Sequence, residues 1–115
     1  MNKYLGIDIG GTKTALVIGN ENYEIIDKIE FKTEAARGFK KFKEELRDRY
    51  SKIQLDNIKG VGISVGGPLD CEKGEIYNPT YLPWGTVNFK DEFKEYFKVP
   101  IYVEHDARAG LMQNF

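Results

Sequence analysis

A carboxylate and two glycines stand at the boundary between the first two strands that this sequence predicts. Residues 4–9 and 14–18 are rich in apolar and β-branched side chains, a composition typical of strands. Gly10, Gly11 and Thr12 then form the turn between them. The simplest interpretation is a Gly-Gly hairpin and nothing more. The same turn, however, lets the backbone approach a phosphate closely and direct bare N–H groups at its oxygens.

The side chains around this turn have the chemistry of a nucleotide site. Thr12 adds a hydroxyl to the backbone donors, and Asp8, near the end of the first strand, can hold Mg²⁺ directly or through water. Lys13 either adds positive charge or points into solvent, and the sequence leaves both alternatives open. The candidate site for nucleotide phosphates and their metal ion therefore comprises Asp8, Gly10, Gly11, Thr12 and Lys13.

A second acidic strand end lies near the end of the sequence. Residues 101–103 predict an apolar strand, and Asp106 follows where small residues begin and a helix is expected. Asp106 either caps that helix by accepting backbone N–H bonds or faces a pocket and acts as a base. Two aspartates at two strand ends fit phosphoryl transfer to a hydroxyl, in which the enzyme positions the groups and neutralises phosphate charge. We predict that Asp8 and Asp106 open into one crevice.

Along the rest of the chain, the spacing of the apolar residues alternates between that of strands and that of helices. Alternation with β-branched residues predicts a third meander strand over 23–31. Apolar residues at spacings of three or four, with lysines and glutamates between them, predict an amphipathic helix near 36–52. The remaining predicted elements are a buried strand over 60–65, a hairpin over 69–76, a short helix capped by Asn88 that carries Phe89, Phe93 and Phe97, and a last strand over 101–103.

Composition indicates one small soluble domain. The chain has 115 residues, of which 41% are hydrophobic and 30% charged, enough for one core and inconsistent with disorder. The net charge of −1 and the pI near 5.9 give no electrostatic reason to expect nucleic-acid or anionic-membrane partners. Because no apolar run approaches a membrane span and no secretory signal is visible, we expect a cytoplasmic protein.

Cys71 and His105 are the only cysteine and histidine in the sequence. A zinc site of cysteine and histidine ligands therefore cannot be built from this chain alone, and an internal disulfide is excluded. Cys71 lies in the predicted hairpin, and a lone cysteine needs an activating environment to react. We interpret it as incidental to function.

Three motifs, taken in order, resemble the N-terminal domain of the ROK family (repressor, open reading frame, kinase), which groups sugar kinases with sugar-responsive repressors. They are the phosphate motif at 8–13, the glycine turn at 62–70 and the acidic segment at 104–109. The resemblance covers essentially the whole chain, yet members of the family normally continue well beyond Phe115. It implies that residues 1–115 are the N-terminal lobe, and that the C-terminal lobe, the adenosine-binding elements and any structural zinc site are absent from this chain.

The resemblance and the order of the predicted elements imply the same fold. We expect an α/β, RNase H-like lobe of the actin and hexokinase type, with a mixed sheet in which three antiparallel meander strands precede alternating helices and strands. In that superfamily, ATP and substrate bind in a cleft between two such lobes. The expected ligands are therefore ATP with Mg²⁺ and a small-molecule sugar, and the complete protein is expected to be a homodimer.

The resemblance also assigns roles on the sugar side. Gly66 and Gly67 resemble the glycines whose backbone lies beside the bound sugar. Glu104, His105 and Asp106 resemble the segment that binds sugar hydroxyls. Asp106 matches the family's general base, which accepts the proton of the attacking sugar hydroxyl.

On the donor side, the resemblance implies that Gly10, Gly11 and Thr12 contact the phosphates of ATP while the terminal phosphoryl group moves to the acceptor. Asp8 would help hold Mg²⁺. Lys13 would add its charge there if it does not point into solvent.

Three positions, Thr80, His105 and Arg108, distinguish this chain from the usual family pattern, and the role of Trp84 is open. Thr80 stands where the family often has asparagine, and its hydroxyl can still bind a sugar hydroxyl. His105 also replaces an asparagine, and an imidazole can both donate and accept hydrogen bonds. Arg108 stands where kinases often have asparagine, a feature also found in regulators of the family. Trp84 either lines the sugar pocket or packs against the domain.

Two functions from different classes follow. The first is the N-terminal half of an ATP-dependent, glucokinase-like sugar kinase that phosphorylates a hydroxyl of a hexose or an N-acylhexosamine and is inactive as this chain alone. The alternative is the sugar-sensing domain of a ROK transcriptional regulator without kinase activity. Such regulators carry a DNA-binding module before this lobe, whereas the first predicted strand begins by Tyr4, so we expect no nucleic-acid partner. A different actin-like ATPase is a third interpretation.

Overall fold

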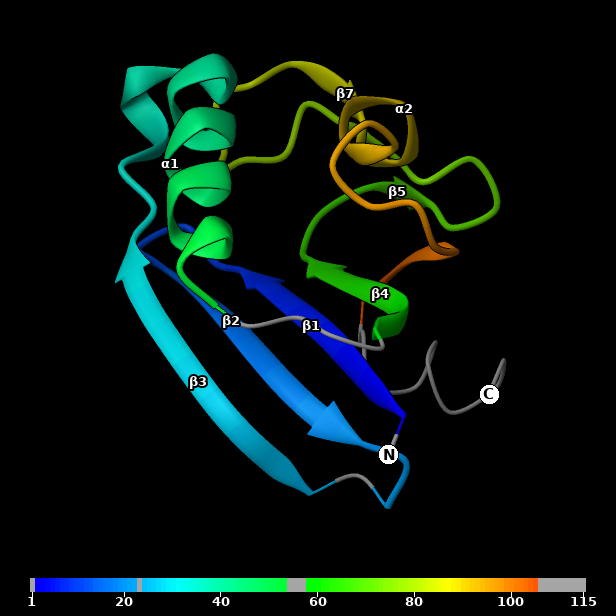
Figure 1. The fold of residues 1–115 in the computed structure, drawn as a ribbon. Helices are drawn as coiled ribbons and strands as arrows, with labels where there is room; N and C mark the ends of the chain where they lie inside the picture. The colour runs from blue at the N-terminus through cyan, green and yellow to red at the C-terminus, as the bar shows by residue number, and fades with distance from the viewer. Residues whose placement is uncertain (1, 23, 54–57, 106–115) are drawn as a thin grey trace.

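The computed structural model describes residues 2–22, 24–53 and 58–105, which are drawn in colour in Figure 1. In these residues a five-stranded sheet carries two helices on one face, and a smaller three-stranded sheet lies beside them (Figure 1). Among the same residues, no helix has both the length and the apolar character needed to cross a bilayer.

The first three strands form an antiparallel meander. β1 (Lys3–Ile9) pairs with β2 (Lys13–Asn20), and β2 pairs with β3 (Ile25–Lys32). Burial alternates along β2, as expected for a strand with one face against a core. The structure therefore confirms the meander that the sequence predicted, including the turn between β1 and β2.

Two further strands extend the sheet beyond β1 and run parallel to it. β4 (Ile58–Val65) pairs with β1, and β8 (Ile101–Glu104) pairs with β4, which gives the order β3-β2-β1-β4-β8. The sheet is mixed, as predicted. Because β1, β4 and β8 run in the same direction, the segments that follow their carboxyl ends all lie at one edge of the sheet.

The register of these strands sets which side chains lie together. Asp8 is aligned with Ser64, and Ser64 is aligned with Glu104. Aligned residues on neighbouring strands point to the same face of a sheet. Their neighbours in sequence point to the opposite face and are fully or almost fully buried: Ile7, Ile9, Ile63, Val65 and Val103.

Helix α1 (Phe39–Ser51) covers the buried face through an apolar stripe that includes Phe42 and Leu46. The predicted helix near 36–52 is therefore confirmed, but it begins later than expected. Residues 35–37 form a separate 3-10 turn, η1 (Ala35–Arg37), because Gly38 has a φ of 95° and interrupts the helical path.

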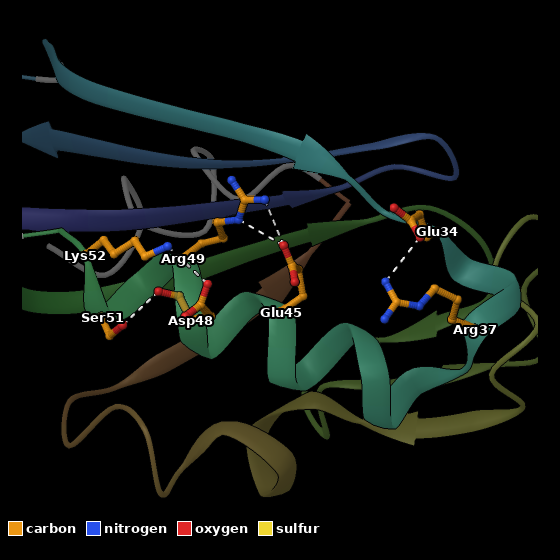
Figure 2. Close-up of polar contacts among 7 residues, drawn as sticks. All are labelled: Glu34, Arg37, Glu45, Asp48, Arg49, Ser51 and Lys52. Carbon is orange, nitrogen blue, oxygen red and sulfur yellow. Dashed lines mark hydrogen bonds and ion pairs between the residues drawn. The ribbon is translucent and has the colours of Figure 1, made fainter.

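Salt bridges line the solvent side of this region. Figure 2 shows Arg49 paired with Glu45 at 2.9 Å and Lys52 paired with Asp48 at 3.3 Å along α1. Each such exposed pair contributes only about 0.3–0.5 kcal/mol. The interleaved charges therefore form an ordinary solvated face, as the sequence indicated, and the apolar stripe provides most of the helix's stability.

The short helix α2 (Phe89–Phe93) begins where the sequence predicted, because the Asn88 side chain accepts a hydrogen bond from the Asp91 backbone N–H at 3.0 Å. It ends at Phe93, however, so Phe97 lies beyond it. Phe89, Phe93 and Phe97 are nonetheless all buried in the same core.

The smaller sheet has the order β5-β6-β7, with β5 (Leu69–Asp70), β6 (Glu75–Tyr77) and β7 (Thr86–Asn88) all antiparallel. Its first two strands are the predicted hairpin over 69–76. Residues 71–74 join these two strands, and Gly74 ends this turn with a φ of 71°, in the region that favours glycine. The loop of residues 78–85 joins β6 to β7 and reaches across to α1 (Figure 1).

We expect Leu46→Ala to lower the free energy of unfolding by about 2–5 kcal/mol, because Leu46 is completely buried and its truncation leaves a cavity under α1. Glu44→Ala on the exposed side of the same helix is the matched control and should stay within about 0.5 kcal/mol. Urea unfolding followed by circular dichroism measures both. Equal losses in the two variants would contradict the placement of α1.

Candidate functional site

Three segments that the sequence singled out lie at one edge of the five-stranded sheet. The turn of residues 10–12 follows β1, Gly66 and Gly67 follow β4, and His105 follows β8. In open α/β sheets, ligands bind outside the carboxyl ends of parallel strands. Residues that are far apart in sequence are therefore brought to the edge at which this class of fold binds its ligands.

The turn after β1 is tight and its backbone is bare. The Gly10 N–H donates to the Lys13 carbonyl at 2.9 Å. A Cβ on Gly10 would lie 2.8 Å from that same carbonyl oxygen, so only glycine fits there. Gly11, Thr12 and Lys13 are exposed. The Gly10 N–H, which was predicted to contact phosphate, is thus already used within the turn, and phosphate binding by the exposed Gly11 and Thr12 stays a prediction.

Two buried threonines attach this turn to the end of β3. The Thr33 hydroxyl donates to the Gly10 carbonyl at 2.7 Å, and it lies 2.8 Å from the Thr14 hydroxyl. Because Thr33 gives its single hydroxyl proton to a carbonyl, Thr14 must donate to Thr33. The Thr33 N–H also donates to the Thr12 carbonyl at 2.9 Å. Sequence reasoning missed this support, and its only signal is a threonine directly after a strand.

We expect Thr33→Val to destabilise the chain by about 1–3 kcal/mol, because it leaves the Gly10 carbonyl and the Thr14 hydroxyl without their buried partner. Thr33→Ser keeps the hydroxyl and should stay within about 1 kcal/mol of the parent. Thermal unfolding of the three proteins checks this. A valine variant as stable as the serine variant would show that the hydroxyl does not hold the turn.

The glycine turn after β4 is equally open. Gly66 and Gly67 are exposed, and Gly67 has a φ of 99°, in the region that favours glycine. A Cβ on Gly67 would lie 2.8 Å from the Cβ of Pro79. The loop of residues 78–85 therefore lies directly against this turn, and a side chain at Gly67 would displace it.

His105 connects the ends of β8 and β4. Its Nε2 lies 3.0 Å from the Gly67 carbonyl, and the Ser64 hydroxyl donates to the His105 carbonyl at 2.9 Å. A carbonyl oxygen can only accept, so Nε2 carries a proton, and Nδ1 of the neutral ring is left as an acceptor. His105 thus orders the glycine turn and still offers one acceptor to a hydroxyl. Ser64 was not predicted from the sequence.

Glu104 lies beside Ser64 and near Cys71. Burial, followed by a hydrogen bond to Glu104 and the charge of that carboxylate, raises the pKa of the Cys71 thiol. A raised pKa lowers the fraction of reactive thiolate at neutral pH. The contact therefore agrees with the interpretation that Cys71 is incidental.

The donor groups at the turn fit Mg²⁺. Asp8 is exposed and is the second-last residue of β1, two residues before Gly10. Mg²⁺ usually takes one or two carboxylates together with phosphate oxygens and waters, so it does not need a cage of protein ligands. Residues 2–22, 24–53 and 58–105 contain no cluster of three or more histidine, cysteine, aspartate or glutamate side chains suited to a metal.

The remaining predicted residues have different outcomes. Trp84 packs against the domain, with its ring centroid 4.7 Å from that of Phe42 and its Nε1 donating to the Ala35 carbonyl at 3.0 Å. Its alternative role in the sugar pocket is therefore not observed. Thr80 is exposed in the loop of residues 78–85. Asp106 and Arg108 lie outside the described residues, and the common crevice of Asp8 and Asp106 stays a prediction.

Comparison with known proteins gives one consistent result. A sequence model of the ROK family matches residues 4–113. A fructokinase from Lactococcus lactis subsp. cremoris is 30% identical over 99% of this chain and 40% of its own length. A ROK family glucokinase from Streptomyces griseus, solved with glucose and AMPPNP, superposes with a TM-score of 0.80 at 23% identity over 94% of this chain and 34% of its own.

A regulator of the same family also has this fold. The structure of a ROK family transcriptional regulator, described as a homologue of the E. coli MLC protein, superposes with a TM-score of 0.73 at 18% identity, covering 93% of this chain and 28% of that one. The chain spans 35–40% of the length of the curated glucokinase and fructokinase relatives that it matches. These likenesses confirm the predicted α/β lobe of the actin and hexokinase type.

Proposed function

Because the chain belongs to the ROK family, we propose that it is the N-terminal lobe of a sugar kinase that transfers the γ-phosphoryl group of ATP to a hydroxyl of a hexose or an N-acylhexosamine. The observation that carries this proposal is the meeting of the glycine turns after β1 and β4 with His105 after β8 at one sheet edge. One turn suits a phosphate, and the other adjoins hydroxyl-binding groups. A donor and an acceptor bound there would lie side by side.

On the donor side, Gly11 and Thr12 would offer their N–H groups and the Thr12 hydroxyl to the phosphates. Asp8 would hold Mg²⁺, which neutralises phosphate charge when it is bound. Hydrogen bonds from Thr33 to the Gly10 and Thr12 carbonyls hold the turn, so these donors are already ordered before a ligand arrives. Donors that need no rearrangement stabilise the charge of phosphoryl transfer most effectively.

On the acceptor side, Nδ1 of His105 would accept a hydrogen bond from a sugar hydroxyl, while the exposed backbone of Gly66 and Gly67 would lie along the sugar. Glu104 and Thr80 would complete this set. Asp106 directly follows His105 in sequence and would take the proton of the attacking hydroxyl. A second lobe would close over the nucleotide, so this chain alone should not turn over.

The second function, sugar sensing in a transcriptional regulator, is favoured by the regulator that shares this fold. A sensor needs the acceptor side only. The phosphate turn has no use in a pure sensor. Its exposed Gly11 and Thr12, and the hydrogen bond from Thr33 that supports it, therefore favour the kinase.

The test uses the full-length protein that carries this chain, with glucose, fructose and an N-acylhexosamine as acceptors. Asp106→Asn should retain sugar affinity and lower kcat by about 10²–10⁴-fold, because it removes the proton acceptor and preserves size. Asp8→Asn should raise the Mg²⁺ concentration that half-saturates the rate. Asp27→Asn, on the exposed edge strand β3, is the control and should behave as the parent does.

Coupled detection of ADP measures the rate, and calorimetry measures sugar affinity. A parent protein that binds a hexose but phosphorylates none of the acceptors would favour the regulator. Undiminished turnover in Asp106→Asn would remove that residue from the role of base.

A further inference from the structure

The loop of residues 78–85 contacts both glycine turns of the site. The Cβ of Pro79 approaches Gly67 so closely that a methyl group there would lie 2.8 Å away. At the other turn, a Cβ on Gly11 would lie 3.0 Å from the Cβ of Tyr81 and 3.5 Å from its carbonyl oxygen. One short loop therefore spans from the proposed sugar turn to the proposed phosphate turn.

This loop is fixed at its base. The Asn78 N–H donates to the Gly85 carbonyl at 3.1 Å, which closes the loop on itself. Leu82 is 3% exposed, and the Trp84 ring packs in the aromatic core under α1. Pro79 and Tyr81, the residues that contact the two turns, therefore lie between the closed base of the loop at Asn78 and the buried Leu82.

Tyr81 is the exception within this anchored loop. Its side chain is 80% exposed, although its Cβ is in contact distance of the Gly11 position. Single exposed apolar side chains are ordinary, so exposure alone indicates nothing. What distinguishes Tyr81 is that its Cβ is held against the phosphate turn, two residues after the Pro79 that contacts the sugar turn, while the residue as a whole is exposed to solvent.

Resting on the proposed kinase function, we infer that Tyr81 is a specificity-determining residue whose ring packs against the acceptor sugar. The terminal phosphoryl group must face the acceptor, so an exposed ring on the loop that contacts both turns would meet the acceptor rather than the nucleotide base. The C–H face of a hexose carries slight positive charge, which matches the negative face of an aromatic ring. Such contact binds the acceptor without consuming the hydroxyl that reacts.

The test compares Tyr81→Ala and Tyr81→Phe in the full-length protein, with Ile25→Ala as the matched control. Ile25 is 67% exposed and lies toward the other end of the sheet, paired with Gly19 of β2. Calorimetry measures hexose affinity without nucleotide, and steady-state kinetics measure KM for the hexose and for ATP. Because Tyr81 and Ile25 are both exposed, thermal unfolding should be unchanged in all three variants.

Tyr81→Ala should weaken hexose binding and raise its KM by about fivefold to tenfold, with KM for ATP unchanged. Tyr81→Phe keeps the ring and should stay within about twofold of the parent, as should Ile25→Ala. Unchanged hexose affinity in Tyr81→Ala would overturn the inference and leave the kinase proposal intact. A parent that binds a hexose but does not phosphorylate it would overturn the kinase proposal, while the affinity of Tyr81→Ala would still decide the role of the ring. A parent that binds no hexose would overturn both.

Discussion

The parallel pairing of β1, β4 and β8 is the constraint on which the rest of this structure depends. It aligns Asp8, Ser64 and Glu104 across three strands and brings the segments after those strands to one edge. A shift of one residue in either pairing would turn these polar side chains into the core and the buried Ile63 and its neighbours outward. The apolar face under the two helices therefore fixes the position of the site as well as the stability of the lobe.

Around that edge, uncharged contacts hold the backbone in place. The buried Thr14 and Thr33 hydroxyls support one turn, and the His105 ring connects with the other. The loop of residues 78–85 touches both, because glycines at the two turns leave room for it. The Asp8 side chain belongs to an exposed residue at this edge. A site whose backbone is ordered by neutral hydrogen bonds can bind an anion without first breaking a salt bridge.

Local patterns predicted most of the fold, since strand alternation, helical spacing and turn glycines are read from neighbouring residues. They failed where a distant contact decides the outcome. The late start of α1 is a local effect, because it follows from the conformation of Gly38. The hydrogen bond from Thr33 to Gly10 and the contact of Tyr81 with Gly11, in contrast, join residues that no short sequence pattern connects. Trp84 was left open for the same reason, and its burial depends on α1.

The most direct test of the account is the response of backbone amides in the isotope-labelled full-length protein to hexose and, separately, to a non-hydrolysable ATP analogue with Mg²⁺. The account predicts that the hexose shifts the amide resonances of Gly66, Gly67 and His105, and that the analogue shifts those of Gly10, Gly11 and Thr12. Shifts confined to the opposite edge of the sheet, around Lys3, Asn20 and Ile58, would contradict it.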